Sequence, residues 1–383
     1  MVGMRWDAQR LDLDESTTLP GMPSVRGLLR SVQVPEFPGL TFHEVRAKSA
    51  LNHVPGESAM PFPFTINPYR GCSHSCVYCF ARKTHEWLEL DSGQDFDTQV
   101  VVKTNLVDVL RRELTRASWT REHVALGTNT DPYQRAEGRY KLMPGVIRAL
   151  ADSGTPFSIL TKGTLLRRDV PLLAEAAQRV PLGLGISMAI WDDDLHAGLE
   201  PGVPTPRARL DLVKTLADAG LPCGVFLAPV LPGLTDDVAS LDAALAAIAA
   251  AGATGVTVIP LHLRPGAREW FMAWLSREHP ELVPRYLQLF ARRAYVPAEY
   301  RTWLAQRVAP LLVKHGLDRQ SGGTARKAVD PITNGVPGDP EVGFPEGSLP
   351  TGGMPGVRPK SELDPPPIPA DLSSDTGEQL SLI

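Results

Sequence analysis

A regular alternation of short apolar runs and longer amphipathic segments constrains the fold of this 383-residue chain most strongly. The runs that we expect to form strands cover residues 64–67, 123–127, 157–161, 182–188, 223–229 and 255–261. The segments that we expect to form helices include residues 144–153, 168–179, 206–219 and 236–251. Repeated strand–helix units build a parallel sheet covered by helices. About six units suit an α/β fold of the partial (β/α)6, TIM-like barrel type better than a closed eight-stranded barrel.

Three of the four cysteines lie close together, immediately after the first expected strand. Cys72, Cys76 and Cys79 have the spacing C-x3-C-x2-C, and Gly71 stands at the entry of their loop. Three thiolates without a fourth nearby suit an iron–sulfur cluster that keeps one iron open to another ligand.

A zinc site and a disulfide are the alternatives for these cysteines. With His74 they could form a structural Cys3His zinc site, and the chain would then be a non-catalytic, zinc-stabilised binding module. Zinc motifs usually contain a second pair of ligands, and no second pair follows here. Three neighbouring thiols cannot all pair as disulfides, and nothing in the sequence indicates an oxidising compartment. The spacing therefore favours the cluster.

The string NPYRGCSHSCVYCFAR, at residues 67–82, resembles the radical S-adenosylmethionine (SAM) superfamily. Within it, the string is similar to the branch related to spore photoproduct lyase and to an uncharacterised actinobacterial-type family. Tyr78, the aromatic residue before the third cysteine, belongs to the motif. Strings at residues 130–134, 159–162 and 228–233 also match, so that the resemblance extends over about residues 63–316.

This resemblance implies two cofactors and a reaction type. Cys72, Cys76 and Cys79 would hold a [4Fe–4S] cluster, and the amino and carboxylate groups of SAM would occupy the open iron. One electron would cleave SAM and yield a 5′-deoxyadenosyl radical that abstracts hydrogen from a substrate that the sequence does not identify. The electron donor would be a protein such as a flavodoxin or ferredoxin.

Polar residues follow the expected strands, and ligands of parallel α/β folds bind at the carboxyl ends of strands. Thr130, Lys162 and Ser187 are therefore candidates to contact SAM. The resemblance implies that Lys162 faces its carboxylate, that Ser187 and Thr130 bind the carboxylate or ribose, and that Tyr78 approaches the adenine. A lysine after a strand is more often solvated, which is the alternative for Lys162. Glu200, with Arg207 or Arg209, is either a structural ion pair or part of the lining of the site, and we favour the structural reading.

One departure from the lyases concerns hydrogen transfer. Photoproduct lyases use a cysteine just before the region of Thr130, but residues 126–131 contain no cysteine here. We therefore do not expect lyase activity on DNA photoproducts, and the reaction class stays open. The remaining cysteine, Cys223, begins an expected strand, and we expect it to be a small buried residue.

The sequence outside the expected barrel, residues 56–263, divides into three parts. Residues 1–55 form an N-terminal extension without sustained periodicity, and residues 320–383 are rich in Pro and Gly, which predicts a disordered tail. Residues 264–319 form a helical cap of the radical SAM barrel, rich in arginine and aromatic residues. Such a surface would suit nucleic acid as a partner, but aromatic residues at helical spacing usually pack in a core, and we favour that reading.

Composition limits the function classes. The net charge of −4 argues against binding nucleic acid by overall electrostatics. No apolar run is long enough to cross a membrane, and the N-terminal residues contain no apolar core of a signal peptide. With few cysteines, these features indicate the reducing cytoplasm.

Overall fold

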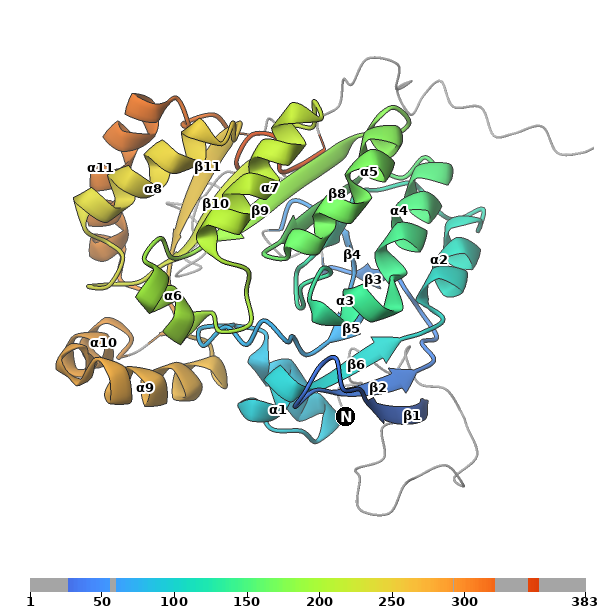
Figure 1. Ribbon diagram of the computed structural model, residues 1–383, viewed down its shortest axis with the longest axis horizontal. Coiled ribbons are helices and arrows are strands. Elements are labelled where there is room, and N and C mark those ends of the chain that lie inside the picture. Colours follow the sequence, from blue (N-terminus) through green and yellow to red (C-terminus); the bar gives the residue numbers. More distant parts are fainter. Residues whose placement is uncertain (1–26, 56–59, 292, 321–343, 351–383) are drawn as a thin grey trace, which may run out of the picture.

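A curved sheet of parallel strands forms the centre of the computed structural model, which describes residues 27–55, 60–291, 293–320 and 344–350. Its parallel strands are, in spatial order, β11 (Gly255–Pro260), β10 (Gly224–Val230), β9 (Leu182–Met188), β8 (Phe157–Thr161), β7 (Val124–Leu126) and β4 (Phe64–Ile66). The short strand β3 (Asn52–His53) continues the sheet antiparallel to β4. The predicted α/β fold with a parallel sheet is confirmed, and its open form agrees with a partial barrel (Figure 1).

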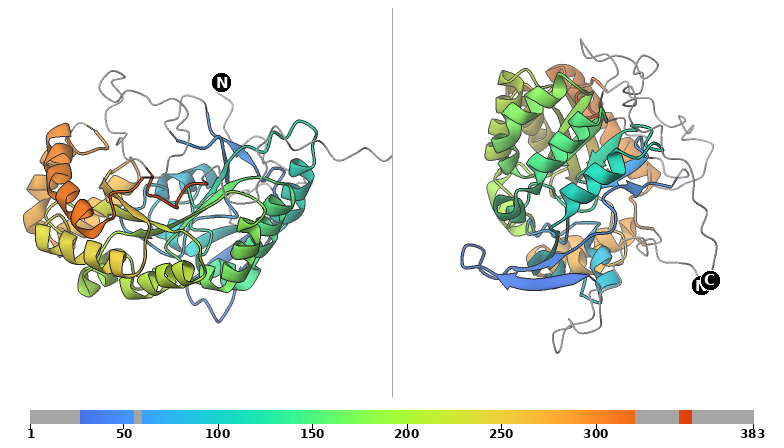
Figure 2. Two further views of the ribbon diagram at one scale, coloured as in Figure 1. Left: turned by 90° about the horizontal axis from the view of Figure 1, so that it is seen from above. Right: turned by 90° about the vertical axis from the view of Figure 1, so that its right-hand side faces the viewer.

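Helices cover the outer face of this sheet, as Figure 2 shows. They are α2 (Leu106–Leu114), α4 (Leu142–Asp152), α5 (Val170–Ala177), α7 (Pro206–Asp218), α8 (Val238–Ala250) and α11 (Ala298–His315). Strand β9 illustrates why the sheet has two different faces. Leu184, Ile186 and Met188 are buried in the main apolar core, whereas Gly185 and Ser187 alternate with them on the inner face. This alternation leaves the inner face open to polar groups.

A second, four-stranded sheet supports the cysteine loop. Its order is β1 (Leu28–Gln33), β2 (Thr41–Val45), β6 (Gln99–Lys103) and β5 (Tyr69–Arg70). The sequence patterns did not predict β1 and β2, because the buried strand β2 contains His43 and Glu44, which hide its apolar alternation. Pairing with the distant β6 is what buries these polar residues.

The segment after β11 differs in part from the expected cap. Helix α9 (Ala267–Glu278), the turn η5 (Pro280–Leu282) and α10 (Val283–Leu289) lie near the carboxyl ends of the strands, whereas α11 packs beside α8 on the outer face (Figure 1). Trp274, Tyr286 and Tyr300 are buried. Most aromatic residues of the segment after β11 therefore pack in the core, as Trp270 and Trp303 do in part.

Part of the Pro- and Gly-rich tail is ordered, contrary to the prediction. Residues 321–343 and 351–383 lie outside the described residues, but residues 344–350 pack against the sheet, and Leu349 is buried. The composition argument failed for this stretch because the sheet supplies the apolar surface that the tail lacks. Within the described parts of the chain, no helix combines the length and apolar character needed to cross a membrane.

Glu137 of α3 (Arg135–Tyr140) joins the second sheet to α4 and to the turn after β8, so its removal tests this arrangement. Its carboxylate accepts hydrogen bonds from Tyr69 Oη at 2.5 Å, Arg168 Nη2 at 2.7 Å and the amide of Leu142 at 3.0 Å. Glu137→Ala leaves the hydroxyl of Tyr69 and the amide of Leu142 without this acceptor, while Arg168 keeps its pair with Asp169. We expect the substitution to lower the free energy of unfolding by about 3 kcal/mol.

The measurement is the urea midpoint of the apoprotein at an unchanged m value. The matched control is Asp152→Ala, which removes an exposed partner of Arg179 and should change stability by less than about 0.5 kcal/mol. Equal effects of the two variants would contradict the role of Glu137.

Candidate active site at the carboxyl ends of the strands

The cysteine loop starts in a backbone conformation that only glycine adopts easily. Gly71 has φ +79°, and a Cβ there would lie 2.8 Å from Cε1 of His85 and 2.9 Å from the carbonyl oxygen of Gln99. The next residue, Cys72, donates its amide to the carbonyl of Phe96 at 2.9 Å. The second sheet and the segment before it thus fix where the loop begins.

Side chains that follow β7 hold the loop from the other side. The carbonyl of Gly71 accepts hydrogen bonds from Thr130 Oγ1 at 2.7 Å and Gln134 Nε2 at 3.0 Å. Gln134 also accepts the amide of Ser73 at 2.9 Å. Thr130 is buried, and its hydroxyl is engaged with the loop. The structure therefore shows Thr130 as a support of the cysteine loop, and its contact with SAM stays a prediction.

His74 is buried, interacts with the thiol of Cys72 and pairs with Asp131. Its Nδ1 lies 3.3 Å from Asp131 Oδ2. Burial alone would lower the pKa of His74, but the Asp131 carboxylate and Cys72 raise it to about 10. Asp131 also accepts the backbone amide of Lys162 at 2.7 Å, so this ion pair joins the loop to the end of β8.

The three cysteine thiols are free and poorly accessible to solvent. Cys72 and Cys76 are buried, and Cys79 is half-buried. Burial and the nearby Glu200 carboxylate raise the pKa of Cys76 well above its usual range, and burial raises that of Cys79 to about 11. Such thiols form thiolates when a metal centre compensates the charge.

The loop supplies three thiols, which are the soft donors that iron–sulfur clusters use. Among the described residues, no group of three or more His, Cys, Asp or Glu side chains has the arrangement of a single-ion site. In a cubane each cysteine binds a different iron, so its thiolates lie farther apart than the ligands of one ion. The grouping of three soft donors therefore suits a [4Fe–4S] cluster.

Glu200 forms the centre of a charged network beside Cys76. Its carboxylate accepts hydrogen bonds from Arg209 Nη2 at 2.7 Å and from the hydroxyl of Tyr78, and it lies 3.2 Å from Lys162 Nζ. Lys162 also donates to Ser187 Oγ at 2.8 Å. The structure thus brings together the predicted residues Tyr78, Lys162 and Ser187.

This network carries one positive charge in excess. Two cations, Lys162 and Arg209, face the single carboxylate of Glu200, and the side chains of Arg209 and Glu200 are fully buried. Burial alone would raise the pKa of Glu200, but the charges of Arg209 and Lys162 hold it well below its usual range. Of these two cations, only Lys162, with a side chain 13% exposed, is open to a ligand. An anionic group at Lys162 would balance the charge.

Sequence reasoning left the role of Glu200 open and did not single out Asn67. Of the two predicted pairs, Glu200 with Arg209 is confirmed, at 2.7 Å, whereas Arg207 lies 3.9 Å from the exposed Asp193. Glu200 also lies 3.2 Å from Lys162, which agrees with the alternative that it lines the site. Asn67 directly follows β4, and its Nδ2 is buried without a hydrogen-bond partner among the described residues. The position of Asn67 at a strand end was the available signal, and a polar ligand would satisfy this donor.

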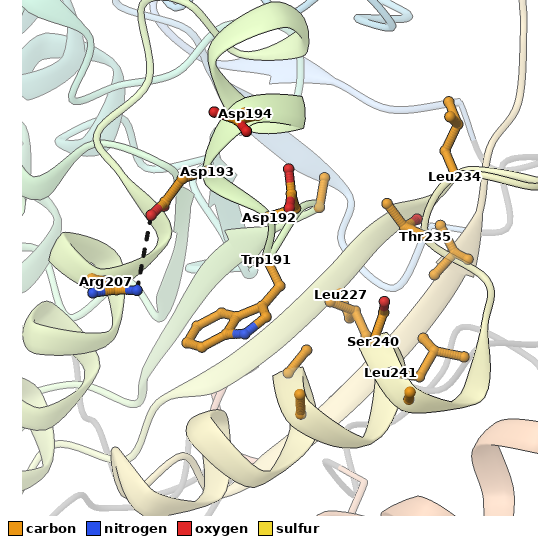
Figure 3. A pocket seen from close by; sticks show the side chains of 15 residues that line it. Trp191, Asp192, Asp193, Asp194, Arg207, Leu227, Leu234, Thr235, Ser240 and Leu241 are labelled. Carbon is orange, nitrogen blue, oxygen red and sulfur yellow. Dashed lines mark ion pairs between the residues drawn. The ribbon is translucent and has the colours of Figure 1, made fainter. Parts of the chain in front are cut away.

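A separate pocket of about 660 Å³ lies on the outer side of the sheet, between α8 and the segment around α6 (Asp193–Leu199). Figure 3 shows Trp191 and Asp192–Asp194 at this pocket, with Asp193 directed to Arg207. None of its lining residues belongs to the cysteine loop or to the network of Glu200. The candidate active site is therefore not this pocket.

Gly202 provides a test of how the loop is held. Its amide donates to the carbonyl of His74 at 3.1 Å, and a Cβ there would lie 2.1 Å from the carbonyl oxygen of Ser73. We expect Gly202→Ala to displace the cysteine loop, to cost about 1–3 kcal/mol of stability, and to reduce the iron bound on anaerobic reconstitution by more than half.

The control is Gly198→Ala, because a Cβ at Gly198 meets nothing closer than Nε1 of Trp274 at 3.8 Å. Iron content and urea midpoint are measured for both variants. If Gly202→Ala bound as much iron as the control, the close approach would not support the cysteine loop.

Comparison with known proteins identifies the family. Residues 66–244 match the model of the radical SAM superfamily. An uncharacterized protein of Mycobacterium tuberculosis is 61% identical over 318 residues, which cover 82% of this chain and 93% of that protein. An uncharacterized protein of Methanocaldococcus jannaschii is 28% identical over 195 residues, which cover 50% of this chain and 69% of that protein.

Solved structures show the same fold. Spore photoproduct lyase complexed with dinucleoside spore photoproduct has a TM-score of 0.54 at 14% identity, covering 72% of this chain and 79% of that chain. A mutant of spore photoproduct lyase has a TM-score of 0.51 at 16% identity, covering 67% and 75%. At these identities the likeness concerns the fold alone. On the match to the family model, the chain belongs to the radical SAM superfamily, whose cofactors are a [4Fe–4S] cluster and SAM.

Proposed function

We propose that Cys72, Cys76 and Cys79 hold a [4Fe–4S] cluster and that the chain reductively cleaves SAM in order to abstract hydrogen from a substrate. One observation carries this proposal: the cysteine loop adjoins a buried network with an excess positive charge, and Tyr78 of the loop donates directly to Glu200 of that network. When bound, the reduced cluster supplies the electron that cleaves SAM to the 5′-deoxyadenosyl radical.

The residues of the chain bind and orient SAM. Lys162 holds the carboxylate of SAM, because it is the accessible cation of the network. Ser187 holds the ammonium group of Lys162 in place and presents its hydroxyl to the same ligand. Asn67 offers its free Nδ2 donor. Tyr78 lies beside Lys162, whose Nζ is 5.6 Å from the ring centroid, and it forms a wall of the site. The electron comes from a small donor such as a flavodoxin or ferredoxin, in the reducing cytoplasm.

The first test is the metal content of the protein. We expect anaerobic reconstitution to give about four iron and four sulfide per chain, and SAM with a reductant to yield 5′-deoxyadenosine. Cys76→Ala should abolish both the cluster and this product. The control, Cys223→Ala, changes a buried cysteine that precedes β10 and should retain both. One tightly bound zinc and no iron in wild-type protein would instead favour a zinc-stabilised binding module.

The second test concerns Lys162. Lys162→Met keeps the length of the side chain and removes the charge, so we expect SAM to bind about ten- to a hundredfold more weakly, as the loss of one charge-assisted hydrogen bond predicts. The cluster content should not change. Lys214→Met is the control, because Lys214 pairs with Asp218 on the exposed side of α7. Unchanged SAM affinity in Lys162→Met would refute the assignment of this residue.

A second candidate function is action on nucleic acid, and one group of side chains favours it. Phe80, directly after Cys79, is exposed, and its ring centroid lies 5.6 Å from that of His262. His262 stacks on Tyr295 at 5.4 Å. Arg264 lies over Phe80 and donates to Tyr295 Oη at 3.1 Å. Aromatic rings beside an arginine suit the stacking of bases and the binding of phosphate.

Binding of a single-stranded oligonucleotide tests this candidate. We expect affinity to fall with salt, as contacts with phosphate require, and Arg264→Ala to weaken binding about tenfold. Arg277→Ala is the control, because Arg277 is an exposed arginine of α9 that pairs with Glu278. No binding at low salt, or equal effects of the two variants, would exclude nucleic acid as the partner of this surface.

A further inference from the structure

Residues 344–350 lie inside the curved sheet, at the end opposite the cysteine loop. They run along the amino-terminal ends of β9, β10 and β11, where Figure 1 draws them in red, and Figure 2 shows them on the concave side of the sheet. Ser348 and Leu349 are buried, at 4% and 6% exposure. This stretch of the tail therefore belongs to the core of the barrel.

Three neighbouring strands have a glycine where the segment passes. A Cβ at Gly183 of β9 would lie 2.5 Å from the carbonyl oxygen of Ser348. At Gly224, the first residue of β10, it would lie 2.9 Å from the carbonyl oxygen of Glu346. At Gly255, the first residue of β11, it would lie 2.8 Å from the amide of Glu346. Because these glycines have no side chains, they leave the space that the segment occupies.

Backbone hydrogen bonds fix the segment in this space. Strand β10 pairs with β9 only from Gly185 onward, and Gly347 accepts the amide of Leu184 at 2.8 Å beyond that point. The amide of Glu346 donates to the carbonyl of Arg319 at 3.2 Å, and Thr254 Oγ1 donates to the carbonyl of Glu346. The segment thus completes pairing that the strands leave open.

One side chain connects the segment to the candidate active site. The ring of Phe344 packs edge-on against that of Phe226, with centroids 5.6 Å apart. Phe226 is the direct neighbour of Ser187 in the register of β9 and β10. Ser187 in turn accepts the hydrogen bond from Lys162. The ring of Phe226 therefore lies between the segment and Ser187, which, with Lys162, we propose to bind SAM.

We propose that residues 344–350 are the floor of the active site: they close the amino-terminal end of the barrel and position Phe226, Ser187 and Lys162 for SAM. This inference rests on the proposed function. The residues of the segment act through Phe226 and are positioning residues. A floor that shifts would displace Ser187, and small displacements of binding groups carry large costs in affinity and rate.

Gly347→Ala in the full-length chain tests this inference. Gly347 has φ +85°, and a Cβ there would lie 2.6 Å from Thr254 Oγ1 and 2.9 Å from the carbonyl carbon of Pro222. Gly316→Ala is the control, because Gly316 has φ +67° and nothing lies within 4 Å of a Cβ at this position. Both variants carry the backbone cost of a left-handed residue, but only Gly347→Ala obstructs the segment. Phe344→Ala removes the ring contact without altering the backbone, and it serves if Gly347→Ala does not fold.

Two quantities are measured: hydrogen exchange of the Leu184 amide, and the dissociation constant of SAM for reconstituted protein. We expect both Gly347→Ala and Phe344→Ala to weaken SAM binding about tenfold, Gly347→Ala to accelerate exchange at Leu184, and Gly316→Ala to do neither. Faster exchange with unchanged SAM affinity would overturn the positioning role, and unchanged exchange in Gly347→Ala would overturn the docking. Failure of wild-type protein to bind SAM would refute the proposed function itself, while the exchange data still report on the docking.

Discussion

The rest of the site depends on the ion pairs that the buried carboxylate of Glu200 forms with Lys162 and Arg209. The carboxylate lies between Lys162 at 3.2 Å and Arg209 at 2.7 Å, and it accepts the hydroxyl of Tyr78. Burying three charges costs several kcal/mol for each ion unless the geometry and additional hydrogen bonds compensate. Here Arg209 also donates to the carbonyl of Ser187 at 2.8 Å, so the network is joined to the end of β9. The network therefore fixes Lys162 and Tyr78 relative to the sheet.

The same network explains how distant parts of the chain meet at one place. Lys162 directly follows β8, Glu200 directly follows α6, and Tyr78 lies in the cysteine loop. Because Gly202 has no side chain, the segment containing Glu200 packs directly against the cysteine loop at Ser73. From the opposite side, residues 344–350 fill the inner face below Phe226. Cysteine loop, charge network and tail segment thus form successive layers along the inner face of the sheet.

The sequence predicted the parallel strands, the cysteine loop and three of the residues around Glu200, because each of these follows from local pattern. The role of Thr130 was less predictable: a strand end shows where a side chain is located, but its bond to the carbonyl of Gly71 depends on tertiary structure. Strand β2 and residues 344–350 escaped prediction because distant segments bury them. The sequence could not decide between a structural and a site-lining role for Glu200, because the same residues form either kind of ion pair.

The electron paramagnetic resonance spectrum of the reduced, reconstituted protein, recorded with and without SAM, tests the central claim most directly. A cluster held by Cys72, Cys76 and Cys79 keeps one iron open, so the account predicts the signal of a reduced [4Fe–4S] cluster that changes when SAM is added. The same experiment on a protein with an intact cluster but no charge at Lys162 should show a much weaker change. A signal that does not respond to SAM in wild-type protein, or the absence of any iron–sulfur signal, would contradict the account.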